Sequence, residues 1–453
     1  MLDRLLGHDF LCSDGRIVRV NTRAARVARG ALSDVQAFVR ALLPAGPLWV
    51  VDDENTHRAA GASVRQTLGA FGHTIPGDAI AGPVAVSELV AKARGAASLV
   101  AVGSGTVNDI VKSAATELGV PYVAVGTALS MNGYTSAISA LLVDGVKRTL
   151  PATPPVGVLI DLDLCAAAPR ALTLAGLGDM LSKPFSEADW RLSHHVLGDP
   201  WVKEPGELLA TAFPRMVKDA TDIGAANPDA LASLAECLLL SGLSMAIAGA
   251  SSPASGAEHL ISHYWDMMCY ARDEHPHGLH GTQVGIACCL VEPLHHRVAS
   301  LGALPASAFN VDAAVAAHPA TRVAAEAQVL ARHGRLPEAV VAAIAVEALK
   351  KWVPRDVLRE RLLRVRDGRD AILAHVREAL LPYGAVRHAL EASGGPTSPE
   401  ALHAELAGDL DDWTVARDIR ARYTVFDFAS EWGLGPGGPN EGLACSERAG
   451  ARA

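Results

Sequence analysis

The residues with the clearest chemical potential lie between positions 255 and 285, where five of the chain's seventeen histidines are found. His259 and His263 are four residues apart in a stretch with helical periodicity, so their imidazoles project from one face at neighbouring turns. His280 follows a turn-rich passage that could return a third nitrogen to the same point. Two helical histidines at this spacing can also pack and hydrogen-bond without an ion. Because a third histidine is present, the pattern favours a catalytic metal site with one open position.

A carboxylate that could complete this site is Asp179, which stands between Gly178 and Met180 in an otherwise apolar helical run. An acid in such surroundings is either a helix cap or a ligand. We therefore take Asp179 as a candidate ligand.

A second chemical feature is the turn Gly103-Ser104-Gly105-Thr106, between an apolar strand over 99–102 and a helix expected to begin near Val107. Glycines there let backbone N–H groups approach a phosphate closely, and the helix N-terminus adds partial positive charge. Helix caps and tight turns use the same residues. The turn departs from the usual dinucleotide fingerprint, since a third glycine is missing and the acidic pair Asp52/Asp53 precedes the turn. A different nucleotide-binding α/β topology is implied.

The elements that must position these residues divide the chain in two. Residues 47–56 predict a buried strand running into a helix cap, a helix continues to about Phe71, and 98–130 reads as strand, glycine turn, helix and strand. From about Arg170 the sequence becomes rich in Ala and Leu at helical spacing. We expect an α/β nucleotide-binding domain with a parallel sheet over 1–168, an all-α metal- and substrate-binding domain over 169–432, and a disordered Gly/Pro-rich tail over 433–453.

Two further stretches in the first half of the chain each allow two interpretations. Residues 126–136 are rich in Thr, Ser, Asn and Gly, which suits either a cofactor cleft or a surface loop. Arg148 follows Lys147 on a hairpin expected over 143–150. The pair could meet a substrate anion, or lie on a solvated hairpin edge.

Composition excludes several classes of function. A net charge of −9 over 453 residues gives no overall basic field, so general nucleic-acid binding is not expected. The seven cysteines contain no CxxC pair and their number is odd, which argues against a disulfide framework and fits a reducing cytoplasm. No uncharged apolar run of eighteen residues occurs, so we expect no membrane insertion.

Taken together, six motifs carry a resemblance that runs from about residue 45 to about residue 430. They are GSGTVND (103–109), PYVAVGTALSMNGYTS (121–136), LPATPPVGVLIDLDL (150–164), AGLGDMLSKPFSEADWRLS (175–193), SGAEHLISH (255–263) and HGTQVG (280–285). The set resembles the bacterial sn-glycerol-1-phosphate dehydrogenases. These belong to the superfamily of iron-containing alcohol dehydrogenases, glycerol dehydrogenases and 3-dehydroquinate synthases. The resemblance implies a nucleotide-binding α/β domain, a helical domain and a metal between them.

Residue by residue, the resemblance implies Asp179, His259 and His280 as metal ligands, with His277 as an alternative third ligand, and His263 as a residue that contacts substrate. The cofactor, NAD or NADP, is expected on the phosphate turn and on the hydroxyl-rich loop. The positions implied are Gly103, Ser104, Gly105, Thr106, Val107, Thr127, Ala128, Leu129, Ser130 and Ser136. Asp52 or Asp53 near a ribose would favour NAD, by accepting from its 2′-hydroxyl.

One departure from the family pattern is Asn132, which stands where many relatives carry an acidic substrate-binding residue. A neutral side chain leaves one negative charge fewer, which should ease binding of a phosphorylated substrate. A divalent ion (Zn²⁺, Ni²⁺ or Fe²⁺) on one carboxylate and two imidazoles would polarise the C2 carbonyl of dihydroxyacetone phosphate for hydride transfer from the reduced nicotinamide. His263 would bond the substrate or relay a proton.

The expected activity is therefore reversible, metal-dependent reduction of dihydroxyacetone phosphate to sn-glycerol 1-phosphate, whose product could feed phospholipid. A polyol dehydrogenase acting on free glycerol uses the same scaffold, and a 3-dehydroquinate synthase-like cyclase would need further basic residues in the cleft. Asn132 alone supports a further alternative, in which the chain is a catalytically altered relative that binds nucleotide. We expect a small phosphorylated triose as the binding partner and a homo-oligomer, a dimer or larger.

Overall fold

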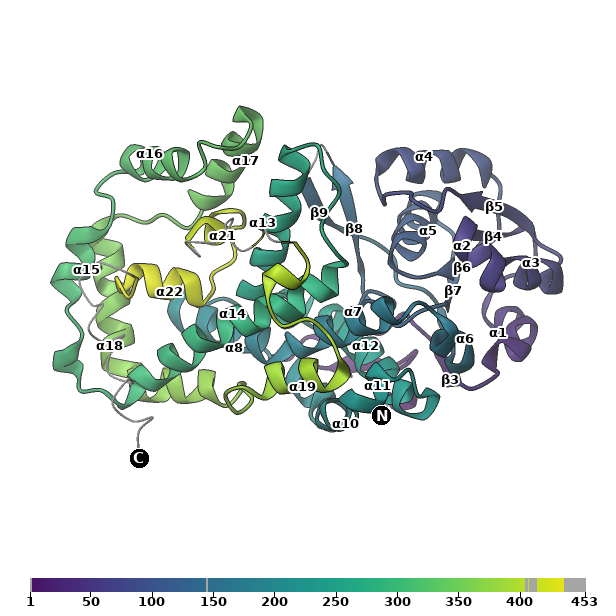
Figure 1. Cartoon of the computed structure of the whole chain (residues 1–453), viewed down its shortest axis with the longest axis horizontal. Coiled ribbons are helices and arrows are strands. Elements are labelled where there is room, and N and C mark those ends of the chain that lie inside the picture. The colour runs from purple at the N-terminus through teal and green to yellow at the C-terminus, as the bar shows by residue number, and fades with distance from the viewer. Residues whose placement is uncertain (1, 144–145, 404–405, 407–413, 436–453) are drawn as a thin grey trace.

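A computed structural model describes residues 2–143, 146–403, 406 and 414–435. The chain forms an α/β part built on a parallel sheet and a mainly helical part beside it (Figure 1). This confirms the fold class expected from the sequence. The predicted disordered tail lies, from residue 436 on, outside the described residues.

The central sheet has six strands, all parallel, in the order β3 (Ala24–Ala28), β10 (Gly157–Asp161), β7 (Tyr122–Gly126), β6 (Ser98–Gly103), β4 (Leu48–Asp53) and β5 (Phe71–Ile75). The central strands β6, β7 and β10 are buried along their whole length. Successive strand residues face opposite sides. Val100 and Val123 pack with α1 (Val35–Leu42) and α3 (Ala62–Leu68), whereas Leu99 and Ala124 pack with α4 (Pro83–Lys92) and α5 (Gly105–Leu118). Covering both faces explains the continuous apolar strands.

The order of the strands places a topological switch between β4 and β6. From β4 the chain moves outward to β5 through α2 (Glu54–Thr56) and α3, and it then returns to the other side of β4 to build β6, β7 and β10. In open α/β sheets, ligands bind outside the carboxyl ends of the strands at such a switch. The glycine turn after Gly103 lies at this position.

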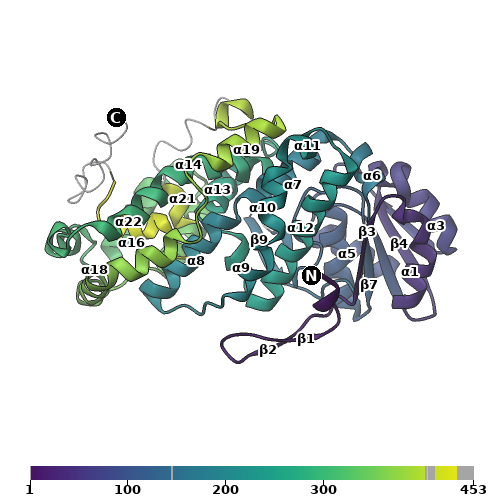
Figure 2. The ribbon, with the colours of Figure 1, turned by 90° about the horizontal axis from the view of Figure 1, so that it is seen from below.

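Two antiparallel hairpins accompany the sheet. The first, β1 (Asp9–Leu11) with β2 (Ile17–Arg19), projects at the lower edge of the view in Figure 2. The second, β8 (Ile138–Val143) with β9 (Val146–Pro151), lies between the sheet and α13 (Ala257–Ala271) of the helical part (Figure 1). The second hairpin is therefore the part of the N-terminal half that reaches the helices.

The helical part begins directly after β10. Its helices are α6 (Leu162–Ala167), α7 (Arg170–Leu181), α8 (Lys183–Leu197), α9 (Glu204–Leu209), α10 (Ala212–Lys218), α11 (Ala220–Gly224), α12 (Pro228–Ala248), α13 (Ala257–Ala271), α14 (His280–Ser300), α15 (Val311–Ala317), α16 (Arg322–Arg332), α17 (Glu338–Ala348), α18 (Arg355–Arg377), α19 (Ala385–Ser393), α21 (Thr414–Asp418) and α22 (Val425–Glu431). The boundary predicted at residue 168 falls between α6 and α7. In the described part of the chain, only α12 is long and apolar enough to cross a bilayer, and 83% of its apolar window is buried inside the protein.

Some expected elements differ from those observed. The helix predicted to run to Phe71 ends at Leu68, because Gly69 adopts a left-handed conformation (φ 60°) that stops it, and Phe71 instead begins the edge strand β5. The helix expected from about Val107 begins two residues earlier, at Gly105. The Ala-rich strand β3, which pairs with β10, was not predicted.

Candidate metal centre and nucleotide site

The three candidate histidines come together where α13 and α14 meet. His259 and His263 lie on α13, and His280 is the first residue of α14. The ring centroids of His259 and His280 are 5.3 Å apart, as are those of His263 and His280. The helical spacing and the turn before His280 thus produce the predicted cluster.

Close packing of α7 on α14 brings Asp179 to this cluster. A Cβ on Gly178 would lie 2.2 Å from the carbonyl oxygen of Gly281, and a Cβ on Gly281 would lie 2.0 Å from that of Ala175. Only glycine allows backbones to approach so closely. As a result Asp179 Oδ1 lies 3.7 Å from His259 Nε2.

The hydrogen bonds of His259 direct one ring nitrogen toward Asp179. Its Nδ1 lies 2.7 Å from the buried carboxylate of Glu258, which can only accept. Nδ1 therefore carries the proton, and the lone pair is on Nε2. A carboxylate behind a histidine is the usual arrangement around a protein-bound metal, where it fixes the tautomer and raises ligand basicity.

A chain of amide and hydroxyl groups fixes His280 in the same way. Gln283 Nε2 donates to Asp266 Oδ1 at 3.0 Å and to the carbonyl of His277 at 3.2 Å, so Gln283 Oε1 must accept from Ser262 Oγ at 2.7 Å. Ser262 has then used its proton, and His280 Nδ1, 3.0 Å away, donates to it. His280 accordingly carries its lone pair on Nε2.

Asp179 is held as an anion by groups that surround it. Burial alone would raise the pKa of Asp179, but the positive charge of Lys183 outweighs this effect and holds the pKa well below the usual range. Lys183 Nζ lies 3.2 Å from Oδ1. Asn132 donates its backbone N–H to Oδ2 at 3.2 Å and its side-chain amide to Oδ1 at 3.4 Å. The loop after β7 thus reaches the carboxylate directly.

The residues present fit a divalent metal ion. One ionised carboxylate and two imidazoles, each with its lone pair on Nε2, form a donor set that suits zinc, nickel and iron. A second trio, His263, Asp266 and His280, has ligand atoms all within 4.8 Å of one another. The two sets share His280, and they lie side by side. Asp266, however, already accepts a hydrogen bond from Gln283 Nε2 at 3.0 Å.

The alternative ligand His277 lies in a different group. Its ring stacks on that of His403, with centroids 3.9 Å apart, and its ligand atom lies within 4.8 Å of those of Cys269 and Glu274. The guanidinium of Arg272 bonds Glu274 at 3.1 Å in the same group. The structure therefore separates His277 from the ligands proposed for the metal centre.

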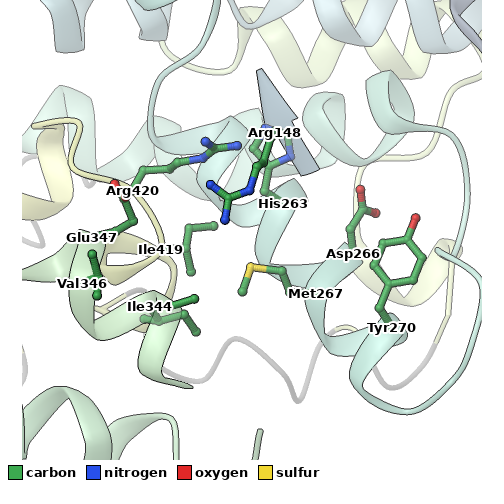
Figure 3. A pocket seen from close by; sticks show the side chains of 11 residues that line it. Arg148, His263, Asp266, Met267, Tyr270, Ile344, Val346, Glu347, Ile419 and Arg420 are labelled. Carbon is green, nitrogen blue, oxygen red and sulfur yellow. The ribbon is translucent and has the colours of Figure 1, made fainter. Parts of the chain in front are cut away.

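A pocket of about 280 Å³ opens beside the histidine cluster (Figure 3), slightly below the roughly 300–1,000 Å³ that small-ligand sites usually have. His263 and Asp266 form part of its wall, together with apolar side chains from α13 and α17 and with two arginines, Arg148 and Arg420. A small substrate in this pocket would contact the histidine cluster.

The glycine turn adopts the geometry expected for a phosphate site. Ser104 is the N-cap of α5 and makes no side-chain cap hydrogen bond; instead its hydroxyl bonds that of Ser130. Val107 is buried against Gly103, where a Cβ would lie 2.5 Å from Val107 Cβ. The first backbone N–H groups of this fourteen-residue helix, those of Gly105 and Thr106, point out of its N-terminus, where the helix dipole favours an anion.

The hydroxyl-rich loop packs between the sheet and the helices. Thr127, Ala128 and Leu129 are buried, and the backbone at Leu129 packs on α7, since a Cβ on Gly176 would lie 1.8 Å from the Leu129 carbonyl oxygen. Ser136 is 1% exposed, and its hydroxyl lies 3.0 Å from Lys112 Nζ. The loop thus continues from the nucleotide edge to Asn132, and Ser136 serves to hold it in place.

Asp52 does not lie where a ribose could reach it. Its carboxylate is fully buried at the end of β4, where it accepts from Arg65 at 3.1 Å and from Thr74 at 2.7 Å, and it lies 3.0 Å from His57 Nδ1. Asp53 caps α2 instead. We therefore leave Asp52 out of the nucleotide site proposed below.

Four residues that support the centre were not predicted. Lys183 has the clearest signal in the sequence, because it stands four residues after Asp179 on helical spacing. Glu258 adjoins His259 in the chain. Ser262 and Gln283 have no such signal, since they meet only when α13 and α14 pack.

Residues 26–169 match the model of the iron-containing alcohol dehydrogenase family. A Pyrococcus furiosus protein named glycerol-1-phosphate dehydrogenase [NAD(P)+] is 31% identical over 60% of this chain and 78% of its own length. A Halalkalibacterium halodurans protein of the same name is 36% identical over 54% of this chain and 64% of its own length. The chain thus spans slightly less than two thirds of this second relative.

The comparison of structures agrees with that of sequences. An iron-containing alcohol dehydrogenase from Thermococcus thioreducens superposes with a TM-score of 0.56 at 14% identity, over 96% of this chain and all of the other. At that identity the likeness concerns the fold. The family match, the sequence relatives and the shared fold lead to one conclusion: the chain belongs to the iron-containing alcohol dehydrogenase family, in the branch of the glycerol-1-phosphate dehydrogenases.

Proposed function

We propose that the chain catalyses the reversible reduction of dihydroxyacetone phosphate to sn-glycerol 1-phosphate, with NADH or NADPH and one divalent metal ion. The observation that carries the proposal is the contact of Asn132 with Asp179, because it joins the nucleotide edge of the sheet to the metal centre. A hydride donor bound along the glycine turn and the hydroxyl-rich loop would therefore face a ketone bound beside the histidine cluster. The names of the sequence relatives support the same substrate and cofactors.

The metal centre is proposed to consist of Asp179, His259 and His280. A divalent ion held there would supply the positive charge that polarises the substrate carbonyl. Glu258 and Ser262 keep the two imidazoles in the tautomer that ligation requires, and Lys183 keeps Asp179 ionised at any pH near neutrality. We propose zinc, nickel or iron as the ion, since the donor set suits all three.

His263 is the proposed proton donor during reduction. Its side chain lines the pocket from the same helix face as His259, and its ring stacks on that of His280 at 13° between planes. It can therefore hydrogen-bond a substrate oxygen that lies beside the ion, and pass a proton to the alcohol directly or through water.

The nucleotide is proposed to bind with its pyrophosphate on the turn from Gly103 to Val107. The backbone from Thr127 to Ser130 would form the adjoining wall of the cleft. Two residues that the sequence suggested for the nucleotide site are left out of the proposal. Ser136 is bonded to Lys112 and Asp52 to Arg65, so each has a structural role inside the protein.

Asn132 is expected to favour a phosphorylated substrate. An aspartate at this position would place a second carboxylate next to that of Asp179. The two negative charges would repel each other, and both would repel the phosphate of an incoming substrate. The neutral amide donates to Asp179 instead. We further propose a cytoplasmic enzyme that assembles as a homo-oligomer.

The test is oxidation of NADH or NADPH, followed at 340 nm, with dihydroxyacetone phosphate and with dihydroxyacetone, before and after chelation and with single metals restored. The proposal predicts metal-dependent turnover that prefers the phosphorylated ketone. Equal turnover of both ketones would point to a polyol dehydrogenase. Nucleotide binding with no turnover of either ketone under any metal would point to a catalytically altered relative.

A further inference from the structure

The pocket beside the metal centre contains two basic side chains from distant parts of the chain. Arg148 lies on β9, opposite Leu141 of β8, and Arg420 lies in the turn that follows α21. Both point into the pocket, with their guanidinium groups on the side where His263 lies (Figure 3). A hairpin from the α/β part and a segment near the C-terminus thus place two positive charges at one end of the cavity.

The charges are close enough to affect each other. Burial lowers the pKa of Arg420, the carboxylate of Glu347 opposes this effect, and the charge of Arg148 makes a smaller contribution that lowers the pKa again. Two guanidinium groups that repel one another in a partly enclosed pocket are stabilised by an anion between them, and a dianion offsets both charges.

The two carboxylates of the pocket have other partners. Glu347 accepts from Lys350 Nζ at 2.5 Å, and Asp266 accepts from Gln283 Nε2 at 3.0 Å. Figure 3 shows Asp266 on the far side of His263 from Arg420. The two guanidinium groups therefore lie at the end of the pocket nearer His263, with Glu347 beside Arg420 (Figure 3).

We propose that Arg148 and Arg420 form the subsite that binds the phosphate group of the substrate, an inference that rests on the function proposed above. A three-carbon ketone with its phosphate between the arginines would extend along the pocket, so that its carbonyl could approach the histidine cluster. The arginine fork suits phosphate, because its N–H groups can pair with two oxygens at once. The side chains of Met267, Ile344 and Ile419 supply an apolar wall for the carbon chain.

The subsite also joins two parts of the protein. Because Arg148 belongs to the hairpin and Arg420 to the helical part, a phosphate bound by both would link the hairpin to the segment that follows α21. The unphosphorylated ketone lacks this link. The two arginines are thus specificity-determining residues, and the metal centre does not depend on them.

The test compares Arg148→Gln, Arg420→Gln and the double variant with the wild type, by kcat/KM for dihydroxyacetone phosphate and for dihydroxyacetone. Arg322→Gln, on the exposed start of α16, is the matched control. Each pocket variant should lose roughly 10- to 100-fold in kcat/KM for the phosphorylated ketone, the range for a lost charged hydrogen bond. The value for dihydroxyacetone should change less than about threefold, since the chemistry at the carbonyl is untouched.

Two further measurements distinguish the loss of the phosphate subsite from misfolding of the variants. Arg148→Lys and Arg420→Lys keep the charge and should keep part of the preference. Inorganic phosphate, tested as an inhibitor of dihydroxyacetone reduction, should lose potency in the Gln variants by a similar factor. A preference that survives in both Gln variants, or an equal fall with both ketones, would overturn the subsite and leave the proposed function standing. If the wild type itself shows no preference for the phosphorylated ketone, the proposed function fails instead.

Discussion

Replacing Glu258 by Gln should weaken metal binding about tenfold without removing any ligand. The acceptor is retained, but its charge is lost at a bond of 2.7 Å between two buried groups, Glu258 Oε1 and His259 Nδ1. Hydrogen bonds to charged groups contribute about 1.5–3 kcal/mol and neutral ones about 0.5–1.5, so the difference is about 1–1.5 kcal/mol, or roughly a factor of ten in affinity. Glu258→Ala, which also frees the ring, should cost about 10- to 100-fold.

The assay is a competition titration of Ni²⁺ or Zn²⁺ between the protein and a chromophoric chelator, with circular dichroism to check the fold. The control is Glu292→Gln on α14. This carboxylate is also buried, but it accepts from the backbone N–H of Gly384 at 2.9 Å instead. If Glu258→Gln and Glu258→Ala both bind metal within twofold of the wild type, while His259→Ala does not bind it, the reasoning about the carboxylate behind the histidine is wrong.

Three other predictions follow from the packing around the site. Burial lowers the pKa of Lys112 from 10.5 to about 8, so the buried charge lowers the stability of the folded protein by its full amount below pH 8. Between pH 8 and 10.5 the unfolded chain binds more protons than the folded one. The unfolding free energy of the wild type, measured by urea titration, should therefore rise by about 3 kcal/mol over this range relative to that of Lys112→Met. A difference that stays flat up to pH 10 would refute this. Gly281→Ala should lower the unfolding free energy by about 1–3 kcal/mol and weaken metal binding as well, because its methyl meets the Ala175 carbonyl; unchanged urea and metal titrations would disprove it. Gly105→Ala should fold normally, since its methyl meets only Met131 at 3.6 Å, yet bind NADH about tenfold more weakly by fluorescence titration; wild-type affinity would remove the turn from the nucleotide site.

The sequence predicted those parts of the fold that depend on local periodicity. The buried strands β4, β6 and β7 have continuous apolar runs, and the turn after Gly103 separates a strand from a helix, so each was expected where it occurs. The edge strands β3 and β5 were missed. Alanines in β3 favour a helix by propensity, and Gly72 in β5 breaks the apolar pattern, so only pairing with a neighbour makes them strands.

The candidate site was likewise predicted only where it depends on local spacing in the sequence. The spacing of His259, His263 and His280 was sufficient to group them, because they lie on adjoining helices. The approach of Asp179 required the glycine contact between α7 and α14, which no local pattern reveals. The pairing of Arg148 with Arg420 is likewise a product of tertiary packing.

The most direct test of the proposed metal centre is a crystal structure of the metal-loaded protein with anomalous data collected at the absorption edge of the ion. The account predicts one peak about 2.0–2.2 Å from a carboxylate oxygen of Asp179 and from Nε2 of His259 and of His280. A peak held by His263, Asp266 and His280, or no peak at this cluster in a protein that turns over, would contradict it.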